Sequence, residues 1–358
     1  MANSRHVEGS AMASYDEKCQ SSEVEDELRR LRVFDLHCDT LDSLCMRDVE
    51  PFATQLSNTV GGDMVENDLA LAAGRMAKAV PGGWTQCYAV WVPDDLSHTP
   101  YTPLEFYRHV RDYFKRQTAA NSCSLARIED ARSAQTAHAW GSVAAMLTVE
   151  NGSPIGHDLA VVDELAADGV KMLTLTWNGK NGIASGNDTA DGMSDFGREA
   201  VRALEDHRIV VDVSHLNDAG FSDLLHVATR PFVASHSNSR AVCPHPRNLT
   251  DAQFGEIRDR GGLVGINYYR AFIADVPAGK DVTFDQLSRH IDHFLSLGGE
   301  KVLALGSDFD GSDTPSWLAR CDDVPAFFSR VASRFGMDLA RRMFYQNAQE
   351  FFERNEVR

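Results

Sequence analysis

Eight strand-like segments alternate with helical patterns, and this alternation limits the fold more than any other feature. The strand candidates are "RVFDLH", "TQCYAVWV", "VAAMLTVE", "VKMLTLTW", "RIVVDVSH", "PFVASH", "GLVGINYY" and "KVLALGSD". Helical patterns such as "FGREAVRALEDH" and "FDQLSRHIDHFLSLGG" separate most of them, and glycine often follows the helix. Eight β/α units over about 250 residues or more predict a (β/α)8 TIM barrel, with the active site at the C-terminal ends of the strands. A doubly wound open sheet is the alternative.

The chain is long enough to bury one large core. It has 358 residues, of which 43% are hydrophobic and 24% charged. Residues 1–28 are polar and rich in Ser and Glu, with a short helix expected in "SEVEDELRRL". We therefore expect a polar N-terminal tail over 1–28 and a single barrel domain over 29–358.

Charge and cysteine usage exclude several classes of protein. A net charge of -17 argues against a nucleic-acid partner, since phosphates require a basic face. We expect no membrane span, because no apolar run approaches about 18 residues. The first residues carry no apolar secretory segment, and the seven cysteines form no C-x-x-C pair. These features predict a cytoplasmic protein, and a homodimer is left open.

Ionisable side chains stand at the ends of five of these strands. Because parallel strands of a barrel end at one rim, these side chains should meet there. Imidazoles and carboxylates buried at this density need cations, and six of them exceed what one zinc ion requires. The pattern therefore favours two metal ions that share a bridging carboxylate. The six residues are His37, Asp39, Glu150, His215, His236 and Asp308.

Side-chain alternation adds two expectations. In the first strand, Asp35 and His37 should share the site-facing side, with Phe34 on the opposite side. In the fifth strand, Asp212 falls opposite His215, which predicts a bulge or a role in supporting a ligand.

The remaining histidines are expected to be structural or surface groups, and Cys38 a small core residue. Surface positions are predicted for His98, His109, His138, His226, His290 and His293.

The sequence also resembles a known family, the renal (membrane) dipeptidases of the amidohydrolase superfamily. The matching stretches run in family order from about residue 33 to 311. They are "DLHCDT", "TVENGSP", "MLTLTWNGKN", "GMSDFGREAV", "VVDVSHLN", "VASHSNSRAVCPHPRNLTD", "GLVGINYY" and "GSDFDG".

The resemblance implies a TIM barrel with two zinc ions per chain. His37 and Asp39 would hold one zinc ion, and His215 and His236 the other. Glu150 would bridge the two. A hydroxide between the ions would hydrolyse the peptide bond of a dipeptide, with tolerance of a D-residue at the C-terminal position.

The resemblance also assigns residues to the substrate. Asp308 would be the general acid and base, and Arg247 would grip the substrate carboxylate. Two positions depart from the renal enzyme: Trp177 stands where that enzyme has a histidine, and Phe272 where it has a tyrosine. Trp177 is thus a candidate substrate-binding residue, and the substrate range is open.

Two other functions are compatible with the same residues. One is a different binuclear-metal amide or lactone hydrolase, and the other is a non-catalytic metal-binding protein. Asp308 argues against the second, because metal binding alone needs no acid/base group.

Overall fold

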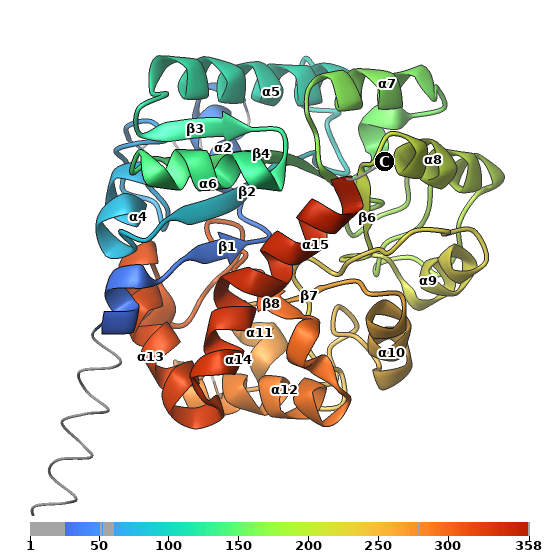
Figure 1. The fold of residues 1–358 in the computed structure, drawn as a ribbon. Coiled ribbons are helices and arrows are strands. Elements are labelled where there is room, and N and C mark those ends of the chain that lie inside the picture. Colours follow the sequence, from blue (N-terminus) through green and yellow to red (C-terminus); the bar gives the residue numbers. More distant parts are fainter. Residues whose placement is uncertain (1–25, 51, 53–60, 278, 357–358) are drawn as a thin grey trace, which may run out of the picture.

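A curled parallel sheet forms the centre of the molecule (Figure 1). The computed structural model describes residues 26–50, 52, 61–277 and 279–356. The strands run in the order β6-β5-β4-β2-β1-β8-β7, and β3 pairs with β4 off this path. They are β1 (Val33–Asp35), β2 (Trp84–Trp91), β3 (Leu125–Ile128), β4 (Val143–Glu150), β5 (Met172–Thr174), β6 (Val210–Asp212), β7 (Val264–Ile266) and β8 (Leu303–Leu305).

A short extended segment joins the two ends of this sheet. Val233 bridges Asp212 of β6, and Ala234 bridges Val264 of β7, both in parallel. The segment "PFVASH", predicted as the sixth strand, thus closes the ring, and Val233 and Ala234 are the residues that form its β-bridges. The predicted TIM barrel is confirmed. The sequence did not indicate β3, which pairs along the first half of β4 outside the ring.

Helices surround the sheet, and several begin at residues that favour helix starts. Thr102, Thr250 and Thr283 each form a reciprocal capping box with the glutamate or glutamine three residues later. The helices are α2 (Thr40–Cys45), α4 (Ala73–Ala79), α5 (Pro103–Ala120), α6 (Ala131–Ala139), α7 (Ala160–Ala167), α8 (Asp195–Asp206), α9 (Asp218–Leu225), α10 (Asp251–Asp259), α11 (Arg270–Ile273), α12 (Phe284–Ser296), α13 (Val324–Phe335), α14 (Met337–Arg341) and α15 (Asn347–Glu356).

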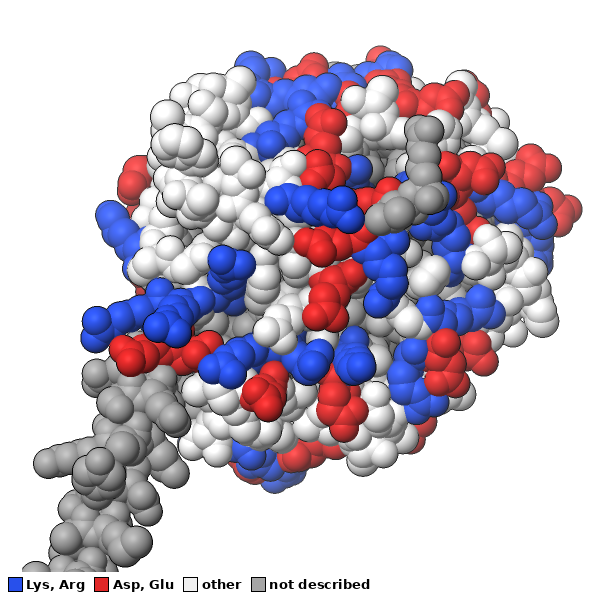
Figure 2. Space-filling view, viewed as in Figure 1, with Lys and Arg blue, Asp and Glu red and all other residues white. Residues whose placement is uncertain are grey.

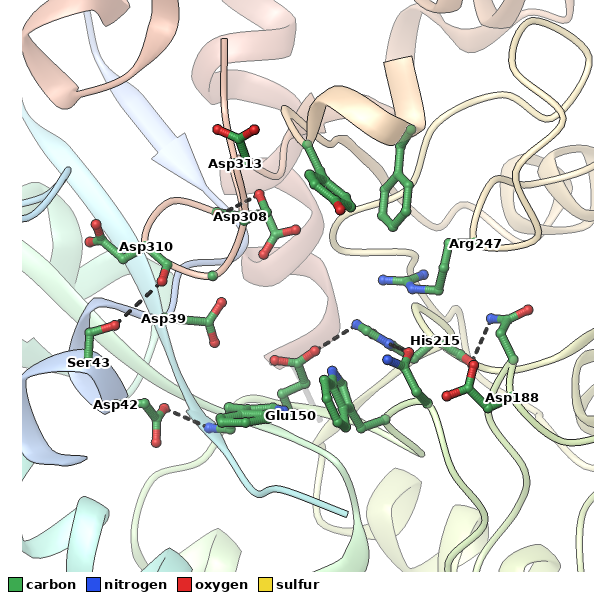
Figure 3. Close-up of a pocket in the computed structure, with 18 of the residues that line it drawn as sticks. Asp39, Asp42, Ser43, Glu150, Asp188, His215, Arg247, Asp308, Asp310 and Asp313 are labelled. Carbon is green, nitrogen blue, oxygen red and sulfur yellow. Dashed lines mark hydrogen bonds and ion pairs between the residues drawn. The ribbon is translucent and has the colours of Figure 1, made fainter. Parts of the chain in front are cut away.

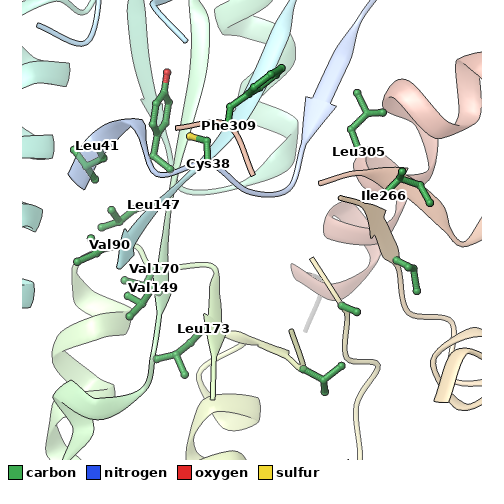
Figure 4. Close-up of a cluster of buried hydrophobic side chains, with 14 of the residues drawn as sticks. Cys38, Leu41, Val90, Leu147, Val149, Val170, Leu173, Ile266, Leu305 and Phe309 are labelled. Atoms are coloured by element: carbon green, nitrogen blue, oxygen red, sulfur yellow. The ribbon is translucent and has the colours of Figure 1, made fainter. Parts of the chain in front are cut away.

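Apolar side chains on the outer face of the strands pack under these helices. Leu147 and Val149 of β4, Leu305 of β8 and the buried Cys38 belong to this layer (Figure 4). The expectation that Cys38 is a small core residue is confirmed. The helices are thereby held against the barrel by burial of aliphatic surface.

The interior of the barrel at the beginnings of the strands is also apolar. Phe34, Ala144, Met146 and Ala304 form one buried cluster with residues of α15. The ring of Phe34 stacks on that of Phe352, with centroids 5.3 Å apart. Apolar side chains therefore close this end of the barrel.

The side-chain alternation predicted for the first strand is wrong. Phe34 lies in the interior cluster, so Asp35 points to the other face, where it accepts hydrogen bonds from Ser307. His37 nevertheless reaches the interior, because β1 ends at Asp35 and the chain no longer follows strand alternation beyond it.

The chain before β1 contacts the last helices. Residues 26–30 are helical, within the segment where a short helix was expected. Glu27 accepts two hydrogen bonds from the Arg341 guanidinium of α14, at 2.8 and 2.7 Å. Most of the predicted tail, residues 1–25, lies outside the described residues.

Charges of both signs are interspersed over the face seen in Figure 2. Several form ion pairs, such as Arg108 with Glu164 and Arg111 with Asp168. Within the described part of the chain, every helix is too short or too polar to span a bilayer.

Candidate metal centre and substrate cavity

Glu150, at the end of β4, lies between two groups of side chains. Its Oε2 is 3.4 Å from His37 Nε2. Its Oε1 is 2.7 Å from His215 Nε2 and 3.8 Å from His236 Nε2. Each oxygen of this one carboxylate therefore faces a different part of the site, and Figure 3 shows the side toward His215.

Two carboxylates complete the side near His37. Its Nε2 lies 3.4 Å from Asp39 Oδ2 and 3.9 Å from Asp308 Oδ1. Two groups of potential ligands result: the fully buried His37, Glu150 and His236, and His37 with Asp39 and the partly buried Asp308. The structure thus brings all six predicted residues together.

Unpartnered buried atoms show that these residues fit metal ions. His37 Nε2, Asp39 Oδ1 and His236 Nε2 are buried and have no hydrogen-bond partner among the described residues. Buried polar atoms without partners cost about 1–3 kcal/mol each. Imidazole nitrogens and carboxylate oxygens are the ligands of zinc and related divalent ions, so bound cations would remove this cost.

Strained backbone shapes this end of the barrel. His215 and Asp308 have φ values of 70° and 58°, and Asn151 and Asp310, beside other site residues, have φ values of 79° and 68°. Left-handed conformations of non-glycine residues cluster at functional sites. Close approach also matters, because a Cβ atom at Gly311 would overlap the carboxylate of Asp39. The chain therefore turns sharply where the strands end.

Neighbouring side chains fix two of the imidazoles. His236 Nδ1 lies 2.7 Å from Ser235 Oγ, and Ser235 in turn donates to Asp212. His215 Nδ1 is 2.9 Å from Asn178 Oδ1. Such contacts orient a ligating imidazole and leave its Nε2 for a metal. Asp212, expected either to mark a bulge or to support a ligand, is hydrogen-bonded to Ser235 and through it to His236 rather than to His215.

Asn267 holds one oxygen of Asp308. Its amide oxygen accepts from Tyr269 N at 2.6 Å, and its amide nitrogen donates to His236 O at 3.2 Å. A backbone N–H and a backbone carbonyl thus fix which way the amide points. The nitrogen therefore donates to Asp308 Oδ2, at 3.0 Å, and Oδ1 remains on the side of His37.

Burial strongly perturbs the titration of the cluster. It raises the pKa of Glu150 to about 7 and that of Asp308 to about 6. It lowers the pKa of His215 and of His236 well below the usual range, which favours the neutral imidazole that a metal requires. For His37, burial opposes the charged form, but Asp39 and Glu150 raise the pKa well above its ordinary value. The carboxylates of the site therefore stabilise a positive charge placed beside them.

A cavity of about 780 Å³ opens onto the cluster. Arg247 lines it and is 7% exposed, and its Nε has no hydrogen-bond partner among the described residues. Its guanidinium lies 5.3 Å from the centre of the Phe272 ring. Trp177 lines the cavity too and packs edge-to-face on Trp91, with ring centroids 4.9 Å apart. Trp177 and Phe272, the two positions expected to differ from the family pattern, therefore both line the cavity.

Two histidines expected at the surface are buried. His290 is fully buried, accepts from Ser239 N at 3.1 Å and contacts Ile273 O at 2.8 Å. His138 lies behind β2, with Nε2 3.2 Å from Thr85 Oγ1. The expectation was wrong because both histidines lie on the buried faces of their helices; both nitrogens of His290 meet polar partners there, whereas His138 Nδ1 has none among the described residues.

Sequence reasoning also missed Asn178, Ser235 and Asn267, which position site residues. Ser235 and Asn178 adjoin His236 and Trp177 in the chain, so adjacency was an available signal. Asn267 offered none beyond its place at the end of a strand.

A buried set of imidazoles and carboxylates at the C-terminal mouth of a β/α barrel defines a metal-dependent hydrolase. The model of the membrane dipeptidase family (Peptidase family M19) matches residues 22–357, and the chain belongs to this family of metallo-dipeptidases.

Curated relatives and solved structures agree with this placement. The chain is 38% identical over 191 residues to an uncharacterized protein of Klebsiella pneumoniae, covering 51% of this chain and 70% of the relative. It is 30% identical over 201 residues to an uncharacterized dipeptidase of Schizosaccharomyces pombe, covering 54% of this chain and 48% of that relative. The chain thus spans about half the length of the second relative.

Two crystal structures of metallopeptidases are similar over nearly the whole barrel. One, described as a dipeptidase, has a TM-score of 0.78 and 28% identity, covering 91% of this chain and 99% of that one. The other, from Rhodobacter sphaeroides, has a TM-score of 0.79 and 26% identity with the same coverage. It is liganded with a phosphinate mimic of the dipeptide L-Ala-D-Ala.

Proposed function

We propose that this protein hydrolyses dipeptides with two zinc ions per chain. The observation that carries the proposal is the position of Glu150, whose Oε2 faces His37 while its Oε1 faces His215 and His236. A carboxylate placed in this way can be shared by two ions. His37 and Asp39 would hold one of them, and His215 and His236 the other.

Two zinc ions, when bound, would supply the Lewis acidity that activates a water and polarises the peptide carbonyl. Asp308 accepts the proton of that water and delivers it to the leaving amine. The proton travels on Oδ1, because Oδ2 accepts a hydrogen bond from Asn267. The two oxygens of Asp308 thus have different roles: Oδ1 carries the proton, and Oδ2 accepts the hydrogen bond from Asn267.

Arg247 selects substrates with a free carboxylate. It is a buried cation in the cavity wall, and a guanidinium can hold a carboxylate by two parallel hydrogen bonds. Burial lowers the pKa of Arg247 to about 10, which still leaves it charged at neutral pH. The L-Ala-D-Ala mimic bound to the Rhodobacter sphaeroides enzyme supports a dipeptide substrate with a D-residue at its C-terminal end.

Trp177 and Phe272 shape the substrate range. Phe272 supports the guanidinium of Arg247 through its ring face and offers no hydroxyl to a ligand. Trp177 contributes an apolar wall next to His215, with ring centroids 6.2 Å apart.

The test pairs a change in the enzyme with a change in the substrate. Arg247→Ala and C-terminal amidation of L-alanyl-D-alanine each remove one partner of the same interaction. Each should lower kcat/KM by a similar factor, and the two together should cost little more than either one. Arg289→Ala, on the surface of α12, is the control and should behave as wild type. Equal kcat/KM of Arg247→Ala and wild type on both substrates would contradict the assignment and favour a different amide hydrolase.

A further inference from the structure

Asp42 is a buried carboxyl group in the cavity wall that no metal or proton role uses. It lies on α2, one helical turn beyond Asp39, and is 2% exposed. Its Oδ2 accepts a hydrogen bond from Trp91 N at 2.7 Å. Its Oδ1 is buried without a hydrogen-bond partner among the described residues. An acceptor left in this state is costly unless a ligand satisfies it.

Most other carboxylates of the cavity already have partners. The lining includes seven carboxylates and one guanidinium. Asp310 accepts from Thr40 Oγ1 at 2.5 Å and from Ala70 N at 2.7 Å, and Asp313 pairs with Arg270 at 2.9 Å. Asp188 is exposed to solvent. Asp42 alone of these four is buried with an oxygen that lacks a protein partner.

Asp42 and Arg247 lie on opposite sides of Glu150 (Figure 3). A dipeptide whose carboxylate is held at Arg247 and whose peptide bond lies at Glu150 would therefore extend its N-terminal residue toward Asp42. Its α-ammonium group, next to the scissile carbonyl, would lie on the side of Asp39 and Asp308. Because Asp42 lies one turn further along α2, a longer side chain would be needed to reach it.

The surroundings of Asp42 suit a cation. Trp91, whose backbone binds Asp42, lines the same cavity and packs against Trp177. Indole faces attract ammonium and guanidinium groups, and a carboxylate provides the charge partner. Burial raises the pKa of Asp42 well above its usual range, and a cation beside it would favour the ionised form.

We infer that Asp42 forms a subsite for a cationic side chain, the primary ammonium or guanidinium of an N-terminal lysine, ornithine or arginine residue of the substrate. The inference rests on the proposed dipeptidase function. It makes Asp42 a specificity-determining residue, distinct from the groups that carry the hydrolysis.

The test compares two substrates that differ by one charge, L-lysyl-D-alanine and L-norleucyl-D-alanine, on zinc-loaded enzyme. Wild type should prefer the lysyl substrate in kcat/KM by at least about tenfold, the scale of a hydrogen bond to a charged group. Asp42→Asn still accepts from Trp91 N but lacks the charge, so the ratio should fall to about one. Asp313→Asn alters a carboxylate already paired with Arg270, and its ratio should stay at the wild-type value.

Equal cleavage of both substrates by wild type would overturn the subsite and leave the dipeptidase function standing. An Asp42→Asn variant that keeps the full preference, with or without an equal loss of both activities, would also overturn it and make Asp42 a structural residue. If wild type cleaves no dipeptide, the proposed function fails, and calorimetric binding of L-lysyl-D-alanine decides the subsite. Binding at least tenfold weaker in Asp42→Asn would then support it, and equal binding would overturn it.

Discussion

At the end of the barrel where the strands begin, Phe34, Met146 and Ala304 meet the aromatic rings of α15 in a buried apolar cluster. At the other end the same strands lead to the ionisable residues His37 and Glu150, which are buried as completely, and to Asp308, which is partly buried. Along β4, the interior side changes from Ala144 and Met146 to Glu150 within eight residues. Burial of apolar side chains at the first end stabilises the fold. Burial of ionisable groups at the other end costs desolvation free energy, which bound cations would offset.

We therefore expect stability and chemistry to be separable in this molecule. Substitutions at the apolar end should change the free energy of unfolding and leave the reaction intact. Substitutions at the polar end should change the reaction with smaller effects on unfolding.

Replacing Asp308 by Asn should lower kcat by about 10²- to 10⁴-fold, the usual scale for loss of a general acid and base. Metal content should not change, because five other residues would hold the ions. Steady-state kinetics and metal analysis of the same preparation check both statements. If the variant also lacks zinc, Asp308 is chiefly a ligand.

Asn267→Leu sharpens the same prediction. Loss of the amide frees Asp308 Oδ2 and should lower kcat with little change in KM, because Asn267 contacts Asp308 and does not line the cavity. Asn267→Gln, which retains an amide, should recover part of the loss. A change confined to KM would show that Asn267 serves substrate binding instead.

Phe352→Ala should destabilise the apolar end by about 3–5 kcal/mol, since it opens a cavity beside Phe34. Activity per folded molecule should remain at the wild-type level. Chemical unfolding gives the free energy, and Trp140→Ala is the matched control. Trp140 is 82% exposed, so its loss should change stability by less than about 0.5 kcal/mol. A comparable loss in both variants would contradict the comparison.

His290 should make the folded protein sensitive to acid. Burial lowers its pKa from 6.5 to about 4, so between these values the unfolded chain binds the proton more readily than the folded one. Stability should therefore fall as the pH drops from 6.5 to 4, by at most on the order of 3 kcal/mol from this residue. His290→Gln keeps a donor for Ile273 O and cannot titrate, so its unfolding free energy should depend less on pH over this range. Identical pH dependence in both proteins would exclude His290 as a source.

The barrel could be predicted from the sequence because each strand carries its own apolar pattern between turn residues. The exceptions have physical causes. The segment "PFVASH" has the apolar pattern of a strand, but only two of its residues form β-bridges. The extent of pairing depends on where the neighbouring strands lie, and the sequence of the segment does not show this. β3 was missed because its pattern, "LARI", is short and only partly buried.

The site residues could be predicted from their positions at strand ends, but their supports could not. His37 was predicted to face the interior by an alternation that β1 does not continue, so the expected position was right for the wrong reason. The contacts of Asn267 with Tyr269, His236 and Asp308 depend on how three strand ends meet in space. The sequence alone does not show how these strand ends are placed relative to one another.

The most direct test of the account is the zinc content of the native protein at saturating zinc, together with that of Glu150→Gln. If Glu150 bridges two ions, wild type should contain two zinc ions per chain, and loss of the shared charge should weaken both together. Metal analysis after dialysis against graded chelator concentrations measures the number and the affinities. Two ions in wild type that leave Glu150→Gln at similar, lower chelator concentrations would support the account. One ion or none in wild type, or a variant that keeps one ion at wild-type affinity, would contradict it.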